Sequence, residues 1–281
     1  MSANAPKSGP SAVVVIAIGS AATVAAVGVI VALSLNLMST QSPVRSVDGD
    51  EEQELTEIVL DARWEHGGAL GNDDFETVED IVAGRLERID ITDFDISVDD
   101  DQIHITFDDE LDDETLDAAS TVLDLTFKVD FRPVLNSGPC LESNDYTDYG
   151  PEEEVVFCDQ EDFAALLLGP SELSGESLMG ATTQELDDGT WGVSLTFNST
   201  GASALASLTQ RLVGAEGATD RLAFTLGGVV LESPEVTEAI LDGEVAISGT
   251  MDEAQAEALA AQLRVASKGL VLSVASVTQP S

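Results

Sequence analysis

Acidic side chains are the most abundant candidate ligands in this chain. They are densest in DDD at 99–101, FDDELDDETLD at 107–117 and NDYTDYGPEEE at 144–154. Carboxylates bind calcium, but none of these segments has the D-x-[DN]-x-[DN]-G spacing of a calcium loop. The acids near Asp112 are also explained as caps of a following helix. We therefore predict no metal site and keep a structural calcium as the alternative.

The remaining candidate ligands are Cys140, Cys158, His66 and His104. Two thiols are too few for a zinc site, and both histidines are distant from them in sequence. In a domain outside the cytoplasm, two cysteines most simply form one disulfide. We predict a Cys140–Cys158 disulfide and place the histidines on strand surfaces.

No group of residues indicates an enzyme. The chain lacks a G-x-S-x-G nucleophile motif and a phosphate-binding glycine loop, and pairs of carboxylates arise by chance among 53 acids. Trp191 alternates with Val193, Leu195 and Phe197, which predicts a core position rather than a ligand platform. We predict no catalytic residue and no cofactor.

The charge is strongly asymmetric. There are 53 acidic and 11 basic residues, a formal net charge of -42, and every acid lies from Asp48 onward. Such a field repels nucleic acid, so nucleic-acid binding is excluded as a function. Solubility, or adaptation to a salty exterior, explains the charge without a specific ligand.

An uncharged apolar run occupies residues 12–38. As a helix it would be roughly 40 Å long, enough to cross a bilayer. A cleaved signal peptide is the alternative, but the run is longer than the usual signal core. We predict one transmembrane helix, with a cytoplasmic tail at 1–11, an acidic linker at 39–54 and the remaining chain outside the cell membrane.

The first part after the linker alternates strands and helices. We expect a strand from Thr56 to Glu65, a helix capped by Thr77, a hairpin of two runs over 93–100 and 102–109, a helix from Asp112 and a strand over 125–134. This order is that of a ferredoxin-like unit.

A second unit follows a loop over 136–154. Its expected elements are a strand near 163–168, a strand pair around 187–190, a helix over 200–213, two strands flanking Gly227-Gly228 and a last strand over 270–277.

The stretch from Leu231 to Leu263 is the most strongly specified. Ser233-Pro234 predicts a short helical turn ending at Gly243, and 244–248 predicts a strand. Thr250 and Glu253 form a predicted capping box for a longer helix. No residue in this stretch has an evident chemical role.

These elements and their residues resemble the first extracytoplasmic domain of SecD, a membrane component that assists the Sec export channel. The resemblance rests on FRPV at 131–134, LGP at 168–170, LSG at 173–175, the tryptophan strand, and the segment 224–263. The motif residues, to which it gives structural roles, are Arg132, Pro133, Gly169, Gly175, Trp191, Pro234, Gly243 and Gly249.

The resemblance implies an α+β fold with a ferredoxin-like base and an inserted head. The base would comprise 55–135 and 250–277, and the head 136–249. SecD continues into five further membrane helices that carry its proton-coupling acid, whereas this sequence ends at Ser281. A single-pass paralogue without its own motor is therefore expected. Gly227 and the segment 267–270 also depart from the family pattern.

The function implied is that of an accessory of protein export, which binds unfolded preprotein segments or Sec translocon and SecDF components on the outer face. A cell-surface structural or binding module, with cation-dependent partners, is the alternative. An export accessory should bind basic or neutral segments, because the domain is acidic.

Overall fold

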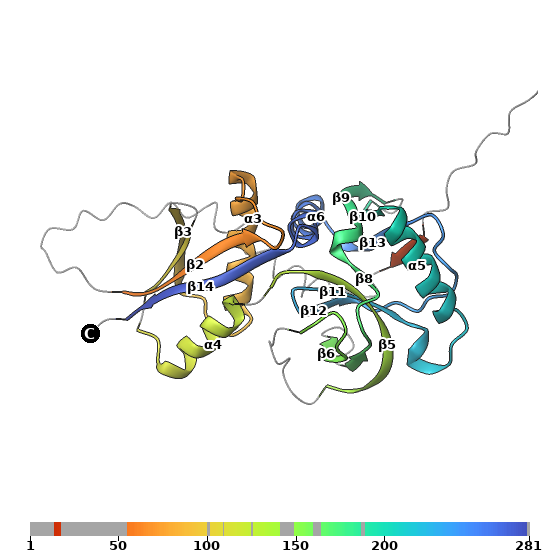
Figure 1. Ribbon diagram of the computed structural model, residues 1–281, viewed down its shortest axis with the longest axis horizontal. Helices are drawn as coiled ribbons and strands as arrows, with labels where there is room; N and C mark the ends of the chain where they lie inside the picture. Colours follow the sequence, from red (N-terminus) through yellow and green to blue (C-terminus); the bar gives the residue numbers. More distant parts are fainter. Residues whose placement is uncertain are drawn as a thin grey trace, which may run out of the picture.

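The computed structural model describes residues 14–17, 55–99, 102–108, 110–124, 126–140, 149–159, 164–186 and 189–279. The molecule is elongated, with a base at one end, a head at the other and helix α6 (Glu253–Ser267) between them (Figure 1). The base contains β2 (Thr56–Trp64), α3 (Asn72–Glu87), β3 (Phe94–Asp99), β4 (Gln102–Phe107), α4 (Asp113–Leu123) and β14 (Leu270–Thr278).

The base has the predicted ferredoxin-like topology. Its strands lie in the order β14-β2-β4-β3, and every neighbouring pair is antiparallel. The two hairpin strands predicted over 93–100 and 102–109 are β3 and β4. Alternate residues of β4 are buried, as expected for a sheet with one covered face.

The order of elements alone predicted 125–134 as the strand that closes this sheet, but β14 pairs with β2 from Glu57 to Trp64 instead. Strand β14 begins at Leu270, within 250–277, the segment that the resemblance assigned to the second part of the base. The strand after α4, β5 (Val129–Pro139), lies in the head, between β11 on one side and β7 and β8 on the other. Strand β5 begins with four consecutive buried residues. This pattern is typical of a strand that has neighbouring strands on both edges and other elements packed on both faces.

The head contains two sheets. One has the order β12-β11-β5-β7-β6 with β8 on β5, and β6 also contacts β12, so that this sheet curls back on itself. The other has the order β1-β13-β10-β9. The head elements are β1 (Val14–Ala17), β5, β6 (Val155–Asp159), β7 (Ala164–Leu168), β8 (Leu173–Ser174), η1 (Gly175–Ser177), β9 (Leu178–Glu185), β10 (Trp191–Phe197), α5 (Ser199–Leu212), η2 (Gly217–Asp220), β11 (Leu222–Leu226), β12 (Val229–Glu232) and β13 (Glu244–Met251).

Two helix starts differ from the prediction. Helix α3 begins at Asn72 rather than after Thr77, because Gly71 donates its backbone N–H to the Asp74 carboxylate and the first turn buries Phe75. Helix α6 is capped by Asp252 and Gln255 rather than by Thr250 and Glu253. Strand β13 runs on to Met251, which pairs with Trp191, so the cap moves two residues along the chain.

The predicted helical turn from Ser233-Pro234 to Gly243 is absent, and this segment is irregular. Its backbone groups bond to neighbouring elements rather than to one another. Val236 donates to the Asp220 carbonyl at 2.7 Å, Pro234 accepts from Leu222 at 3.0 Å, and Ile240 donates to the Thr209 hydroxyl at 3.0 Å. These long-range bonds replace the i to i−4 bonds of a helix.

Helix α6, predicted as part of the base, packs mainly on the head strands β9 and β10, and it also contacts α3 of the base. A single buried cluster of apolar side chains runs through both halves and includes Leu60, Leu86, Leu195 and Leu263. The base and the head therefore share one core across α6.

The predicted membrane helix falls largely outside the described residues. Of 12–38, the structure describes only Val14–Ala17, which form β1 and pair in parallel with Val245–Ser248 of β13. Within the part of the chain that the structure describes, no helix has the length and apolarity needed to cross a membrane. The four residues of β1 thus lie in a strand and not in a helix, and the rest of the predicted membrane helix stays a prediction.

Candidate groove between base and head

A groove of about 880 Å³ lies between the base and the head. It is lined by α3 and β3 of the base, by β9 of the head and by α6. Since α3 contacts β3, α6 contacts β9 and the two helices contact each other, these elements surround the groove in the order β3, α3, α6, β9. The volume is in the range of binding sites for small molecules and short peptides.

Both strands that line the groove are at the edge of a sheet. Strand β3 is the last strand of the base sheet and β9 is the last strand of its head sheet. Among the described residues, β3 pairs only with β4, and β9 only with β10. An edge strand presents unpaired N–H and C=O groups that can pair with another extended chain.

The two sides of the groove differ in chemistry. The base side carries the carboxylates of Glu76, Glu79, Asp80 and Asp95, and the head side carries the hydroxyls of Thr182 and Thr183. Between them α6 contributes the small side chains of Ala254, Ala258 and Ala261. Acidic side chains, a neutral strand edge and a narrow apolar strip are thus brought together from four separate elements.

Among the described residues that line the groove, Arg264 is the one basic residue. Its guanidinium Nη1 donates to the Ala181 carbonyl of β9 at 2.9 Å. This bond ties α6 to β9 and uses one of the acceptors on the edge of that strand.

The carboxylates on α3 lie close enough to affect one another. Burial raises the pKa of Glu79, and the neighbouring charges of Asp80 and Glu76 raise it further. A cation bound beside Glu79 would stabilise the ionised form and lower this pKa again.

Replacing Glu79 with glutamine should therefore stabilise the protein at neutral pH. A carboxyl whose pKa is raised by folding opposes folding once it is ionised, and this cost disappears as the pH falls through the raised value. We expect a gain on the order of 0.5 kcal/mol at pH 7 that vanishes below about pH 4. Urea unfolding of both chains across this pH range measures it.

Glu238, an exposed residue outside the groove, provides the control. Glu238→Gln should show no pH-dependent difference from the parent chain. A Glu79→Gln chain less stable than the parent at pH 7 would contradict the effect of burial and of the neighbouring carboxylates.

Buried and charged contacts join α3 to α4, to the segment that leads to β5 and to the end of α6. The Arg85 guanidinium of α3 donates to the Leu123 carbonyl at 3.2 Å and lies 5.7 Å from the centre of the Phe127 ring, in the segment that leads to β5. Burial and the nearby Arg88 lower the pKa of Arg85 to about 9. Lys268, just after α6, donates to Asp74 at 2.8 Å.

Comparison with known proteins identifies the head. The family model described as the SecDF P1 head subdomain matches residues 153–267. The chain contains a SecD-type domain. The matched range includes α6, in agreement with the packing of that helix on β9 and β10.

Three protein translocase subunits named SecD are similar to this chain. The one from Acidaminococcus fermentans is 37% identical over 106 residues, which cover 38% of this chain and 24% of that protein. The one from Streptomyces coelicolor is 27% identical over 46% of this chain and 23% of its own length. The one from Prochlorococcus marinus is 34% identical over 40% of this chain and 23% of its own length. The chain thus matches about a quarter of the length of each relative.

A crystal structure of SecDF from Thermus thermophilus, described as a translocon-associated membrane protein, has the same fold over most of this chain. The TM-score is 0.53 at 23% identity, covering 92% of this chain and 36% of that one. At this identity the likeness concerns the fold alone.

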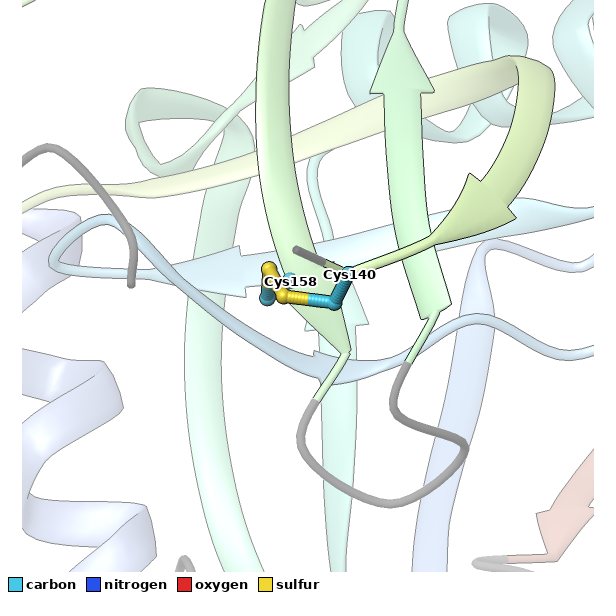
Figure 2. Close-up of a disulfide and its surroundings, with 2 residues drawn as sticks. All are labelled: Cys140 and Cys158. Atoms are coloured by element: carbon cyan, nitrogen blue, oxygen red, sulfur yellow. A yellow bond between two sulfur atoms is a disulfide. The ribbon is translucent and has the colours of Figure 1, made fainter. Parts of the chain in front are cut away.

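The SecD-type domain contains the disulfide predicted from sequence. Cys140, at the end of β5, is bonded to Cys158 of β6, with a Cα–Cα distance of 5.7 Å (Figure 2). Strand β7 pairs with both strands, and its Ala165 lies opposite both Gly138 and Cys158. The bond therefore joins the two strands that flank β7.

Arg132, the charged residue of the FRPV motif, is fully buried in the SecD-type head. Its Nη1 donates to the carbonyls of Glu153 at 2.7 Å and Gly169 at 2.9 Å, and its Nη2 donates to the carbonyl of Gly150 at 3.2 Å. Pro133 accepts a bond from the Gly169 N–H at 2.9 Å. The FRPV and LGP motifs thus meet at one buried guanidinium.

The other motif residues also serve packing. A Cβ on Gly175 would lie 3.0 Å from the Ser267 Cα, so this glycine allows η1 to approach the end of α6. Gly243 has a positive φ of 72° and packs against Ala202. Trp191 packs against the core as predicted, Pro234 lies in the irregular segment, and Gly249 lies within β13.

None of these motif residues lines the groove. The groove residues were missed because alanines on one helix face, threonines on a strand and scattered acids carry no motif. One signal was available in the sequence: residues 178–184 form an uncharged strand, which is unusual in so acidic a chain.

Proposed function

We propose that this protein is an accessory of Sec-dependent protein export, which holds extended segments of exported polypeptides in the groove between base and head. The role proposed is binding rather than catalysis. The observation that carries it is a groove flanked by two strand edges within a SecD-type domain. Extended chains bind to such edges through main-chain hydrogen bonds, which tolerate many sequences.

We propose that the apolar segment 12–38 anchors the chain in the cell membrane, with the SecD-type domain on the outer face, a state in which Val14–Ala17 leave their pairing with β13. The support is the length and apolarity of that segment, together with Lys7 before it and the acidic region after it. This placement would put the groove where a polypeptide emerges from the translocon.

Filling the groove with a bulky side chain should block binding. Ala258 is a partly buried residue of α6 that lines the groove. We expect Ala258→Trp to weaken the binding of a permanently unfolded polypeptide at least about tenfold, which corresponds to about 1.4 kcal/mol. Fluorescence anisotropy with a labelled unfolded preprotein measures the affinity.

Ala206→Trp is the matched control, because Ala206 is a partly buried alanine on α5 that does not line the groove. It should bind like the parent chain. Equal affinity of the two tryptophan variants, or loss of binding in both, would contradict the proposed site.

A further inference from the structure

The two strand edges at the groove are not equivalent. Strand β3 exposes Asp95, Ser97 and Asp99, and charged side chains on an edge strand oppose pairing with another chain. Strand β9 has the sequence LMGATTQE, with no charge before Glu185 and with β-branched threonines at the groove. The edge suited to accept a strand is therefore that of β9.

Part of the β9 edge is already occupied. The Ala181 carbonyl accepts the bond from Arg264, and the next two residues of β9, Thr182 and Thr183, line the groove.

A strand added to β9 would meet α6 on one face, because α6 packs on β9. The α6 residues there are Ala254, Ala258 and Ala261, which form a shallow strip. Successive side chains of a strand point to opposite faces. Every second residue of the added strand would therefore face α6 and should be small. The residues between them would face away from α6 and can have long side chains.

Across the groove from β9 lie the carboxylates of the base. Glu76, Glu79 and Asp80 come from α3 and Asp95 from β3, while Glu257 comes from α6. Arg264, the one cationic side chain among the lining residues that the structure describes, is held at Ala181. Burial raises the pKa of Glu79, and the neighbouring charges of Asp80 and Glu76 raise it further.

We infer that the groove binds an extended polypeptide segment as an added strand on β9, and that it selects segments in which lysine or arginine alternates with small residues. The inference rests on the proposed function and names the class of segment and its mode of binding. The main chain pairs with Thr182–Glu185, the small residues lie on the alanines of α6, and the basic side chains face Glu79 and Asp95. Electrostatic attraction gives selectivity, and main-chain pairing gives affinity.

Four nine-residue peptides test this with the full-length chain. One alternates lysine and alanine, one alternates glutamate and alanine, and two are lysine–alanine peptides N-methylated at the odd or at the even positions. We expect the lysine peptide to bind at least tenfold more tightly than the glutamate peptide and to weaken as salt rises. At least one of the methylated peptides should lose binding, because methylation removes the N–H donors along one edge of the peptide strand.

Variants of the protein test the acidic side. Glu79→Gln with Asp95→Asn should weaken binding of the lysine peptide about threefold to tenfold, as expected for removal of two partly exposed charge pairs. Glu235→Gln with Glu238→Gln, which changes two exposed acids outside the groove, should leave it unchanged. The comparison holds the change in net charge equal.

The outcomes separate this inference from the proposed function. One outcome is that Ala258→Trp abolishes peptide binding, but the parent chain binds both methylated peptides normally or binds the lysine and glutamate peptides equally. The groove then binds polypeptides, but strand pairing with selection for basic residues is wrong. If none of the peptides binds, or if Ala258→Trp changes nothing, the proposed site fails together with the inference.

Discussion

Replacing Arg132 with alanine is expected to lower the free energy of unfolding by about 3–5 kcal/mol, the range found when one partner of a buried charged network is removed. The guanidinium is fully buried and donates to the carbonyls of Gly150, Glu153 and Gly169. Its removal would leave these acceptors without their donor. It would also leave the carboxylate of Asp130, which is buried and 3.9 Å away, without its cation.

Lysine should not restore this stability. One ammonium group on a flexible stem cannot reproduce a planar guanidinium that bonds to three carbonyls, so Arg132→Lys should retain most of the loss. Urea unfolding followed by circular dichroism measures both variants. Arg63→Ala, at an exposed position of β2, is the control and should change the free energy by less than about 0.5 kcal/mol. A loss below about 1 kcal/mol in Arg132→Ala would contradict the role given to this residue.

Removing the disulfide is expected to cost about 3 kcal/mol, the chain-entropy value for a closed loop of this length. Cys140 and Cys158 are separated by 18 positions. Without the bond, the unfolded chain gains the freedom that the closed loop had removed. The end of β5 would then be held to β6 only through β7, which pairs with both.

The single and double serine variants provide an internal check. Cys140→Ser, Cys158→Ser and the double variant all lack the same bond, so they should lose nearly the same stability rather than additive amounts. Thermal unfolding of the three chains and of the reduced parent measures this. A double variant as stable as the oxidised parent would contradict a stabilising disulfide.

Local patterns predicted most of the elements. The base hairpin, α5, the β11–β12 pair, the Asp112 helix cap and the disulfide partners all follow from signals carried within a few residues or from a count of cysteines. Asp112 accepts the N–H bond of Thr115 at 2.8 Å, as expected of an acid placed just before a helix. This bond lowers the pKa of the Asp112 carboxyl.

The errors share a cause, which is competition from distant parts of the chain. The turn predicted at Ser233-Pro234 gives way to bonds with Asp220, Leu222 and Thr209, and no local pattern reveals those partners. Likewise, β14 rather than 125–134 closes the base sheet because it pairs with β2, which lies some 200 positions earlier in the sequence.

The groove could not be predicted for the same reason. Its lining comes from α3, β3, β9 and α6, which are far apart in the chain, and no single element contains a recognisable site. The resemblance to SecD implied a base and a head, but its motif residues, such as Arg132 and Gly175, are buried and serve packing. In this protein, the motif residues and the residues that line the groove are separate sets.

Site-specific photo-cross-linking in membranes tests the central claim most directly. A photoreactive residue is placed at Thr182 in the groove or at Glu238 outside it, in the full-length chain, and a preprotein is stalled during export. We predict an adduct with the preprotein from Thr182, none from Glu238, and loss of the Thr182 adduct when Ala258→Trp is added. Equal adducts from both positions, or none from Thr182 while the preprotein is engaged, would contradict the claim that this groove holds exported chains.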